Sequence, residues 1–196
     1  MLPVFNLGPL SLPVPQFVLL IGFWAGSVLS ERKSKLLLDD PGFIDRLLWS
    51  SLLAGILGAR LSYFARNPAA FSGEYLSLFS LNLNLFDPIG GLLIALSVTF
   101  YIVSRSKNTP LLVLDSISPF LGLFTAAFHL SRFAAGAGFG ILTKIPWAIN
   151  LWGGYRHPVQ LYYLLGSLIT LLIINTLLSN ISYTQGFVFF VFILLT

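Results

Sequence analysis

Long apolar runs separated by short polar stretches dominate the chain. A transmembrane helix needs about 20 mainly apolar residues to cross roughly 30 Å of hydrocarbon, and five runs approach or reach this length. A sixth run, 186–196, is too short to cross at a rise of 1.5 Å per residue. The pattern therefore predicts an all-α polytopic integral membrane protein with about five full transmembrane helices and a short sixth apolar segment. The predicted spans are 13–30, 43–64, 88–104, 110–128 and 158–178.

The composition supports this class and excludes others. Of the 196 residues, 56% are hydrophobic and 9% are charged, whereas soluble domains carry about 25% charged residues. The chain has no cysteine, which excludes disulfides, thiolate metal sites and a cysteine nucleophile of its own. No metal-ligand cluster or cofactor motif is evident, so neither a metal nor a cofactor is predicted. No linker is long enough to divide the chain, which predicts a single membrane domain over residues 1–196.

Basic residues beside the spans predict the orientation. Clusters follow the first and third spans: Arg32, Lys33, Lys35, Arg105 and Lys107. This side is expected to be cytoplasmic, and short clusters of this kind argue against nucleic-acid binding. The N-terminus and segments 65–86 and 129–157 then face outward. Topology does not explain the cations in the outward segments, which are Arg66, Arg132, Lys144 and Arg156.

Three charged residues lie near the ends of predicted spans, and each has a local interpretation. Arg60 lies late in the second span, where an intramembrane charge costs about 2.5–3.5 kcal/mol and marks a functional candidate. The alternative is that its long side chain snorkels to the outer interface. Asp87 and Asp115 each lie next to an expected helix start, where Asp is a common N-cap.

His129 and Arg132 are three residues apart, so they share a face if the fourth helix continues through them. The stretch that follows them has glycines at positions 136, 138 and 140. Such a backbone can approach a ligand closely, or it can permit tight helix packing. For His129 alone, the alternative to a binding role is a hydrogen-bonded core histidine.

The segment GGYRHPVQLYY, residues 153–163, places Arg156 and His157 directly before an apolar helix-length run. Pro158 fits the first turn of a helix, where its missing N–H costs nothing. Free backbone N–H groups and the positive end of the dipole favour an anion at such a helix start. The segment therefore predicts a lipid-phosphate site, with unselective headgroup anchoring by Arg156 as the alternative.

Several stretches, in order and spacing, resemble the prolipoprotein diacylglyceryl transferase family. RHPVQLY at 156–162 is similar to the family's RHPxQLYE and is the most specific match. GARLSY at 58–63 is similar to GxRxGY. FAAGAGFG at 133–140, followed by Thr143 and Pro146-Trp147, resembles FLAGCCxG…T…PW. Gly90-Gly91 resembles the end of an HGG motif, and LGPL at 7–10 resembles the family's first strand-like segment. The resemblance covers nearly the whole chain.

The chain also departs from the family pattern. Tyr163 stands where the family signature ends in Glu, and Ile89 stands at the His of HGG. The tyrosine of the first helix falls on Pro15. A gapless reading puts His129 at the family's central arginine, whereas one gap restores Arg132 to that position. The family's final helix, with a further arginine, is expected to be absent from this chain.

The resemblance implies transfer of a diacylglyceryl group from phosphatidylglycerol to the lipobox cysteine thiol in the signal peptide of a prolipoprotein. It places a multi-pass protein in the bacterial plasma (inner) membrane among membrane lipids, with its active face outward. It implies catalytic roles, in holding phosphate or serving as the base, for His129, Arg132 and His157. Substrate-binding roles are implied for Arg60, Tyr63, Gly136, Gly138, Gly140, Arg156 and Gln160.

Two other functions stay open at this point. A non-catalytic lipid- or lipoprotein-binding membrane protein can be built on the same scaffold. A small-solute transporter is the third possibility, but no inverted repeat is visible in the sequence.

Overall fold

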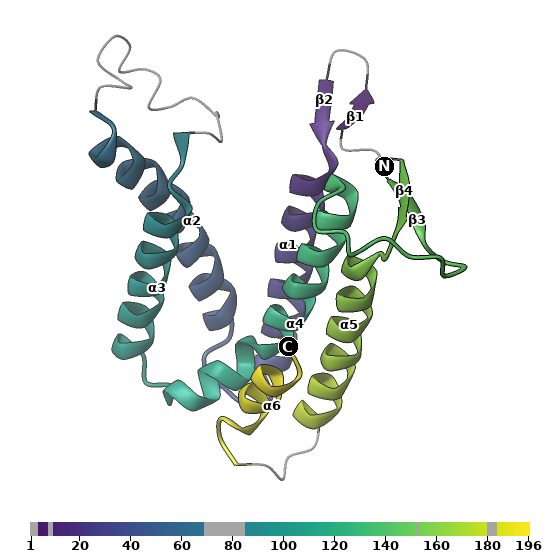
Figure 1. Ribbon diagram of the computed structural model, residues 1–196. Coiled ribbons are helices and arrows are strands. Elements are labelled where there is room, and N and C mark those ends of the chain that lie inside the picture. The colour runs from purple at the N-terminus through teal and green to yellow at the C-terminus, as the bar shows by residue number, and fades with distance from the viewer. Residues whose placement is uncertain (1–3, 8–9, 69–84, 152, 180–183) are drawn as a thin grey trace. The chain divides into compact units, whose positions relative to one another are not determined.

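The computed structural model describes residues 4–7, 10–68, 85–151, 153–179 and 184–196 (Figure 1). Most of the expected outward segment 65–86, and Gly8 and Pro9, lie outside these ranges. Two short strands precede the first helix, and a second pair lies between the fourth and fifth helices. The elements are β1 Val4–Leu7, β2 Leu10–Pro13, α1 Val14–Ser34, α2 Phe43–Arg66, α3 Pro88–Arg105, α4 Pro110–Ala135, β3 Ile149–Leu151, β4 Gly154–Arg156, α5 Val159–Leu178 and α6 Phe187–Leu195.

Helices α1 to α5 are each long and apolar enough to cross a membrane, whereas α6 has nine residues. The predicted polytopic all-α class is therefore confirmed. Helices α1 and α4 end at least four residues beyond the apolar runs that predicted them. Arg32 and Lys33 lie in the last turn of α1, where cations complement the negative end of the helix dipole. Helix α4 continues to Ala135, so His129 and Arg132 do share one helix.

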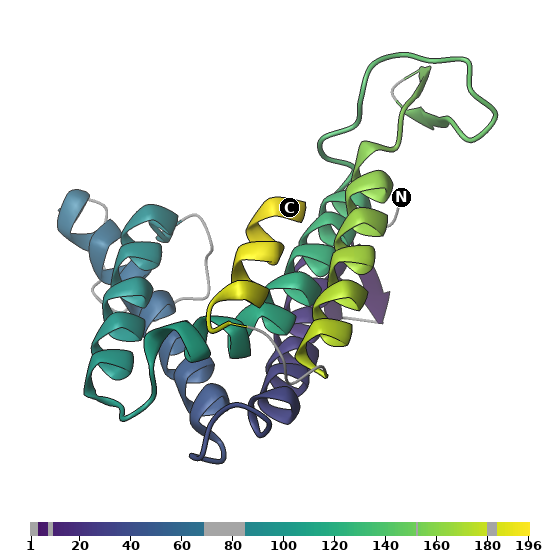
Figure 2. The same ribbon diagram turned by 90° about the horizontal axis from the view of Figure 1, so that it is seen from below.

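Close contacts group the chain into two compact units, Met1–Pro41 with Leu111–Thr196 (unit 1) and Gly42–Pro110 (unit 2). In unit 1, α1 and α4 pack antiparallel. A methyl group added at Gly22 would overlap Ala127, and one added at Gly26 would lie 2.9 Å from the Phe120 ring. Small residues of this kind let membrane helices approach closely. Figures 1 and 2 show α1, α4 and α5 side by side.

A proline inside α4 is accommodated by a serine of α1. Pro119 has no N–H and interrupts the helix ladder. The neighbouring Phe120 N–H donates to the Ser30 hydroxyl oxygen at 2.7 Å, and both Ser30 and Pro119 are fully buried. At the other end of the pair, the Ser131 hydroxyl donates to the Pro15 carbonyl at 2.9 Å. Polar bonds therefore hold both ends of the α1–α4 contact.

Asp115 does not cap its own helix, so that prediction is wrong. It lies inside α4, fully buried, and its carboxylate accepts the backbone N–H groups of Gly186 at 2.7 Å and Phe189 at 2.9 Å. These are donors of the first turn of α6 that have no partner within that helix. The negative charge also lies at the positive end of the α6 dipole. Asp115 thus caps a helix that is distant in sequence.

Unit 2 is the hairpin of α2 and α3, which lie side by side in Figure 1. Its helices touch almost backbone to backbone, because a methyl group added at Gly91 would lie 2.7 Å from the Gly55 carbonyl oxygen. The contacts run antiparallel from the loop end to the far end of the hairpin. The contact pairs are Ser62 with Gly90, Gly58 with Ile94, Gly55 with Ala95, and Ser51 with Thr99.

Candidate functional site

The predicted site residues of unit 1 come together where α4 ends and α5 begins. Helix α4 closes with a Schellman turn, in which the Gly136 N–H donates to the Phe133 carbonyl and the Ala137 N–H donates to the Arg132 carbonyl. Gly136 adopts φ 72°, which glycine accommodates without steric cost. This glycine therefore turns the chain sharply away from the helix directly after Arg132.

Gly138 makes room for the side chain of Arg132. It has φ 80°, and a methyl group added there would overlap the guanidinium, reaching 2.9 Å from Cζ. The same guanidinium lies 5.9 Å from the centre of the Phe128 ring. Within the described part of the chain it forms no hydrogen bond or ion pair, and Arg132 is exposed. Its charge is thus held in place by packing and left open to a ligand.

Gly140 joins the connecting segment to the start of the RHPVQLY motif. Its N–H donates to the His157 carbonyl at 3.0 Å, and its carbonyl accepts from Arg156 Nη1 at 3.4 Å. An added methyl group would lie 2.7 Å from Val159. Strand β4, which pairs antiparallel with β3, carries Arg156 at its end. The glycine therefore permits a close approach of backbone to backbone and of backbone to arginine.

Gln160 ties the segment after α4 to the first turn of α5. It is 2% exposed, and its Nε2 donates to the Ala137 carbonyl at 2.6 Å. Its buried Oε1 has no hydrogen-bond partner among the described residues. Pro158, expected in the first turn, is instead the N-cap of α5. Gln160 therefore fixes the segment after α4 against the start of α5 through this hydrogen bond.

His157 belongs to a small aromatic network. Its Nδ1 lies 3.3 Å from the Tyr162 hydroxyl, and that hydroxyl accepts the Trp147 indole N–H at 2.7 Å. His157 is partly exposed and Tyr162 is exposed, and their ring centres are 6.2 Å apart. The RHPVQLY and PW motifs thus meet in space at Tyr162, which sequence reasoning had not selected as a site residue.

His129 stacks on Tyr163, with ring centres 5.1 Å apart and planes 21° apart. Together with Thr125, Tyr162 and Ser167, the pair lines a small cavity of about 80 Å³. His129 is therefore half-buried in a cavity wall, and the simple core-histidine interpretation does not describe it. Tyr162 links the two histidines, because it contacts His157 and also lines the cavity of His129.

Positive charge at this end of unit 1 is not balanced by acidic residues. Residues 116–196 contain Arg132, Lys144 and Arg156 but no Asp or Glu. We call these three cations, together with His129 and His157, the cationic end. A set of cations without neighbouring carboxylates attracts anions such as phosphate.

Arg60 and Tyr63 belong to unit 2. Arg60 is 7% exposed, donates to the Leu85 carbonyl at 3.2 Å, and lies 5.0 Å from the centre of the Phe86 ring. The side chain is therefore buried against the segment that leads into α3. The backbone carbonyl of Tyr63 accepts from the Asn67 amide at 3.2 Å.

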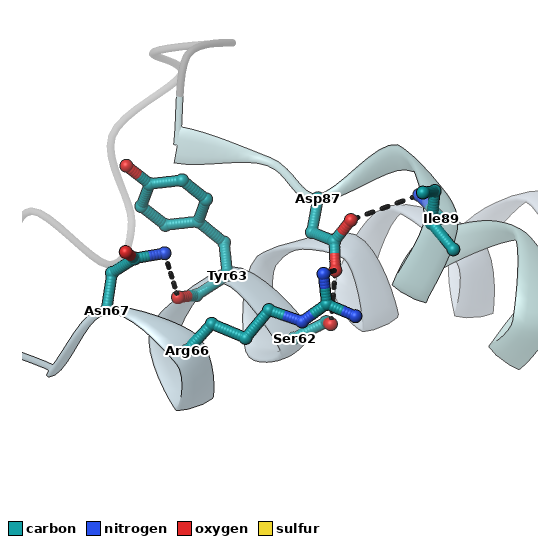
Figure 3. A network of polar contacts seen from close by, with 6 residues as sticks. All are labelled: Ser62, Tyr63, Arg66, Asn67, Asp87 and Ile89. Carbon is teal, nitrogen blue, oxygen red and sulfur yellow. Dashed lines mark hydrogen bonds and ion pairs between the residues drawn. The ribbon is translucent and has the colours of Figure 1, made fainter.

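Asp87, as predicted, caps α3, and it also holds the end of α2 (Figure 3). Its carboxylate accepts from the Ser62 hydroxyl at 2.6 Å and the Ile89 N–H at 3.1 Å, and it pairs with Arg66 at 3.2 Å. The Ser62 hydrogen bond, supported by Arg66, lowers the pKa of Asp87. In Figure 3 the Tyr63 ring points away from this carboxylate. Ile89, at the position of the family's HGG histidine, contributes a backbone N–H here.

Known proteins match this chain over most of its length. It is 30% identical over 169 residues to the phosphatidylglycerol–prolipoprotein diacylglyceryl transferase of Finegoldia magna, covering 82% of this chain and 64% of that protein. The protein of the same name from Vibrio vulnificus is 27% identical, and the match covers 81% of this chain and 60% of that protein. The one from Photobacterium profundum is 28% identical, and the match covers 88% of this chain and 67% of that protein. The chain thus spans about three fifths of the length of these curated relatives.

The family-level match is broader than any of these pairwise ones. The family model described as prolipoprotein diacylglyceryl transferase matches residues 3–196. That range includes α1 to α6, both units, and every predicted site residue. The chain therefore belongs to the prolipoprotein diacylglyceryl transferase family.

Proposed function

We propose that the protein transfers the diacylglyceryl group of phosphatidylglycerol to the lipobox cysteine thiol of prolipoproteins, a step of lipoprotein maturation. The observation that carries this proposal is the cationic end. There, Arg132 is exposed and forms no hydrogen bond or ion pair with any residue that the structure describes. Arg156 lies at the approach to α5, and no acidic residue occurs between 116 and 196. The chemistry of that end suits the phosphate of an anionic lipid.

The bond changes follow from the substrates. A base takes the proton of the cysteine thiol, because thiolate is the nucleophile. The sulfur then forms a bond to a glyceryl carbon, the bond from that carbon to the phosphate oxygen breaks, and glycerol phosphate leaves with the electron pair. Positive charge from Arg132 and Arg156 stabilises the leaving phosphate. The chain itself has no cysteine, so the nucleophile comes from the substrate peptide.

Either histidine is a candidate base, since a neutral imidazole has a ring nitrogen that accepts a proton. His129 faces a cavity beside Tyr163, and His157 contacts the Tyr162 hydroxyl. When His157 donates its Nδ1–H to Tyr162, its Nε2 is free to accept a proton. The three glycines position the cations. Gly136 turns the chain after α4, Gly138 leaves room for the Arg132 guanidinium, and Gly140 lets the backbone approach Arg156.

The orientation of the protein in the membrane is part of the same proposal. The basic clusters at the ends of α1 and α3 support a cytoplasmic location for those helix ends. The cationic end, at the other end of α4, then faces outward from the bacterial inner membrane. Prolipoprotein signal peptides and phosphatidylglycerol are the partners expected there. Arg60 and Tyr63 of unit 2 are proposed to bind substrate, and the burial of Arg60 beside Phe86 supports a fixed position for its charge.

A non-catalytic lipid-binding protein is the second candidate function. Among the described residues, neither histidine hydrogen-bonds or pairs with a carboxylate that would orient it as a base. Tyr163 occupies the position of the family's signature glutamate and stacks on His129 instead. These two observations favour binding of the lipid without turnover.

A reconstituted assay separates the two functions. The purified full chain is placed in vesicles that contain phosphatidylglycerol with labelled acyl chains, and a lipobox peptide is added. We expect a thioether-linked labelled peptide, and none from a peptide whose cysteine is serine. If the protein in these vesicles binds phosphatidylglycerol but forms no labelled peptide, the transferase proposal is overturned and the second function is supported.

The same assay tests the cationic end. Arg132→Gln and Arg156→Gln are each expected to lower phosphatidylglycerol binding by about tenfold, a typical effect for a lost charge-assisted contact. Lys107→Gln, which removes an exposed cation beside α3, is the matched control and should bind like wild type. Equal losses in all three variants would mean that Arg132 and Arg156 act only through net charge.

A further inference from the structure

An apolar groove with an arginine at one end lies at the end of unit 1 opposite to the cationic end. A cavity of about 290 Å³ runs along one face of α1, against a leucine of α4. Residues spaced by four along a helix stack on one face, and two such series form this wall. The lining residues are Trp24, Ala25, Val28, Leu29, Arg32 and Leu123.

Arg32 is the only charged residue among these six, and it lies at the end of α1. It is exposed, and within the described ranges it forms no hydrogen bond or ion pair. Its neighbour Lys33 differs, because its ammonium donates to the Ser179 hydroxyl at 3.1 Å, at the end of α5. The helix dipole alone favours a cation at a helix C-terminus, so the position of Arg32 does not by itself indicate a binding site. The apolar groove that Arg32 lines is the evidence for one.

A larger apolar crevice adjoins the groove. Ala25 and Leu123 also line a larger crevice of about 440 Å³ between α1, α4 and α5, which is lined by apolar residues and reaches Val18. From Arg32 to Val18 is about 21 Å at 1.5 Å per residue. One leaflet of the hydrocarbon core is about half of 30 Å thick. An acyl chain that starts at Arg32 therefore has apolar wall along its whole length.

This groove is distinct from the cationic end. Ser131 bonds the Pro15 carbonyl, which places the end of α4 beside the start of α1. Pro15 and Arg32 are about 25 Å apart along α1, which is close to the full hydrocarbon thickness. The two cationic features therefore face opposite leaflets, and none of the predicted site residues lines the groove.

We propose that this groove binds an anionic phospholipid of the leaflet opposite to the cationic end. Arg32 contacts the phosphate, and one acyl chain lies along Leu29, Val28 and Ala25. The argument is charge complementarity: Arg32, which forms no ion pair among the described residues, lines the end of a groove whose other lining residues are apolar. A zwitterionic lipid offers the same acyl chain but no net charge to Arg32. The bound lipid is a permanent ligand and is not consumed by the proposed transfer.

Trp24 provides the probe, because it is 59% exposed and lines the groove. The full chain with Trp49, Trp147 and Trp152 replaced by Phe is reconstituted in phosphatidylcholine vesicles that contain a small fraction of phosphatidylserine with brominated acyl chains. We expect stronger quenching of Trp24 than by brominated phosphatidylcholine at the same fraction. Phosphatidylserine is used because it is not the proposed substrate, so this result is independent of the transferase proposal.

Three variants sharpen the test. Arg32→Gln should remove the excess quenching by the anionic lipid, which corresponds to about a fivefold loss of apparent affinity for one lost basic contact. Lys35→Gln, which removes an exposed cation at the same helix end outside the groove, should retain it. Val28→Phe fills the groove with the charge intact and should also reduce the excess. Equal quenching by the two lipids, or equal losses in Arg32→Gln and Lys35→Gln, would overturn the proposal.

Discussion

The imidazole of His129 lies nearly parallel to the ring of Tyr163, with ring centres 5.1 Å apart. Aromatic pairs of this kind contribute about 0.5–1.5 kcal/mol beyond their buried area. The tyrosine therefore orients His129 at the cavity, at a position where the family signature has a carboxylate. This contact leads to the first prediction.

Replacing Tyr163 with leucine is expected to release His129 and to lower the rate of the proposed transfer by about 3- to 10-fold. Tyr163→Phe keeps the ring and should behave like wild type. The measurement is the initial rate of thioether formation at saturating peptide. A leucine variant as fast as the phenylalanine variant would show that the stacking does not position the histidine.

Gly138→Ala tests whether the absence of a side chain at position 138 makes room for the Arg132 guanidinium. Both Gly138 and Gly153 have positive φ, at 80° and 77°, but only Gly138 has the guanidinium against it. Either alanine costs about 1–2 kcal/mol for the left-handed backbone. Only Gly138→Ala should also weaken phosphatidylglycerol binding, because it displaces Arg132. Binding measured for both variants separates backbone strain from the arginine, and equal binding would contradict the assignment.

Asp115→Ala is expected to destabilise unit 1 by about 1–3 kcal/mol, because it leaves two partly buried N–H groups at the start of α6 without their acceptor. Asp115→Asn keeps one acceptor oxygen and should fall between alanine and wild type. Thermal unfolding in detergent gives the order of the three proteins. An alanine variant as stable as wild type would mean that water replaces the carboxylate.

The pH dependence of the α2–α3 hairpin follows from Asp87. Its pKa in the folded chain is lowered below the ordinary 3.8, first by the Ser62 hydrogen bond. The stabilisation is therefore fully present above pH 3.8 and is lost as pH falls through the folded-state pKa. Asp87→Asn should be less stable than wild type at neutral pH, and the difference should close in acid. An acid titration of unfolding checks this, and a difference that is constant with pH would contradict it.

The helices were predictable because each apolar run is continuous along the chain. The residues that complete the site depend on distant partners. Sequence alone could not show that Gly138 seats Arg132, or that Tyr162 connects His157 with the cavity of His129. Asp115 was misassigned for the same reason, since helix-start position is a local signal and its partners lie 71 and 74 residues away. Apart from the strand-like segment that the resemblance implied at 7–10, the strands were not predicted, because runs of three or four residues carry little periodicity.

The cap on α6 has a consequence for the order of synthesis. At about 5–20 residues per second, the ribosome completes Gly186 roughly 4–14 s after Asp115, from the 71-residue separation. During that interval the carboxylate has neither of its helix N–H partners. Water or lipid headgroups must solvate it, which favours an α4 that stays near the membrane surface until α6 emerges. We therefore expect insertion of α4 to its final depth to be coupled to translation of α6.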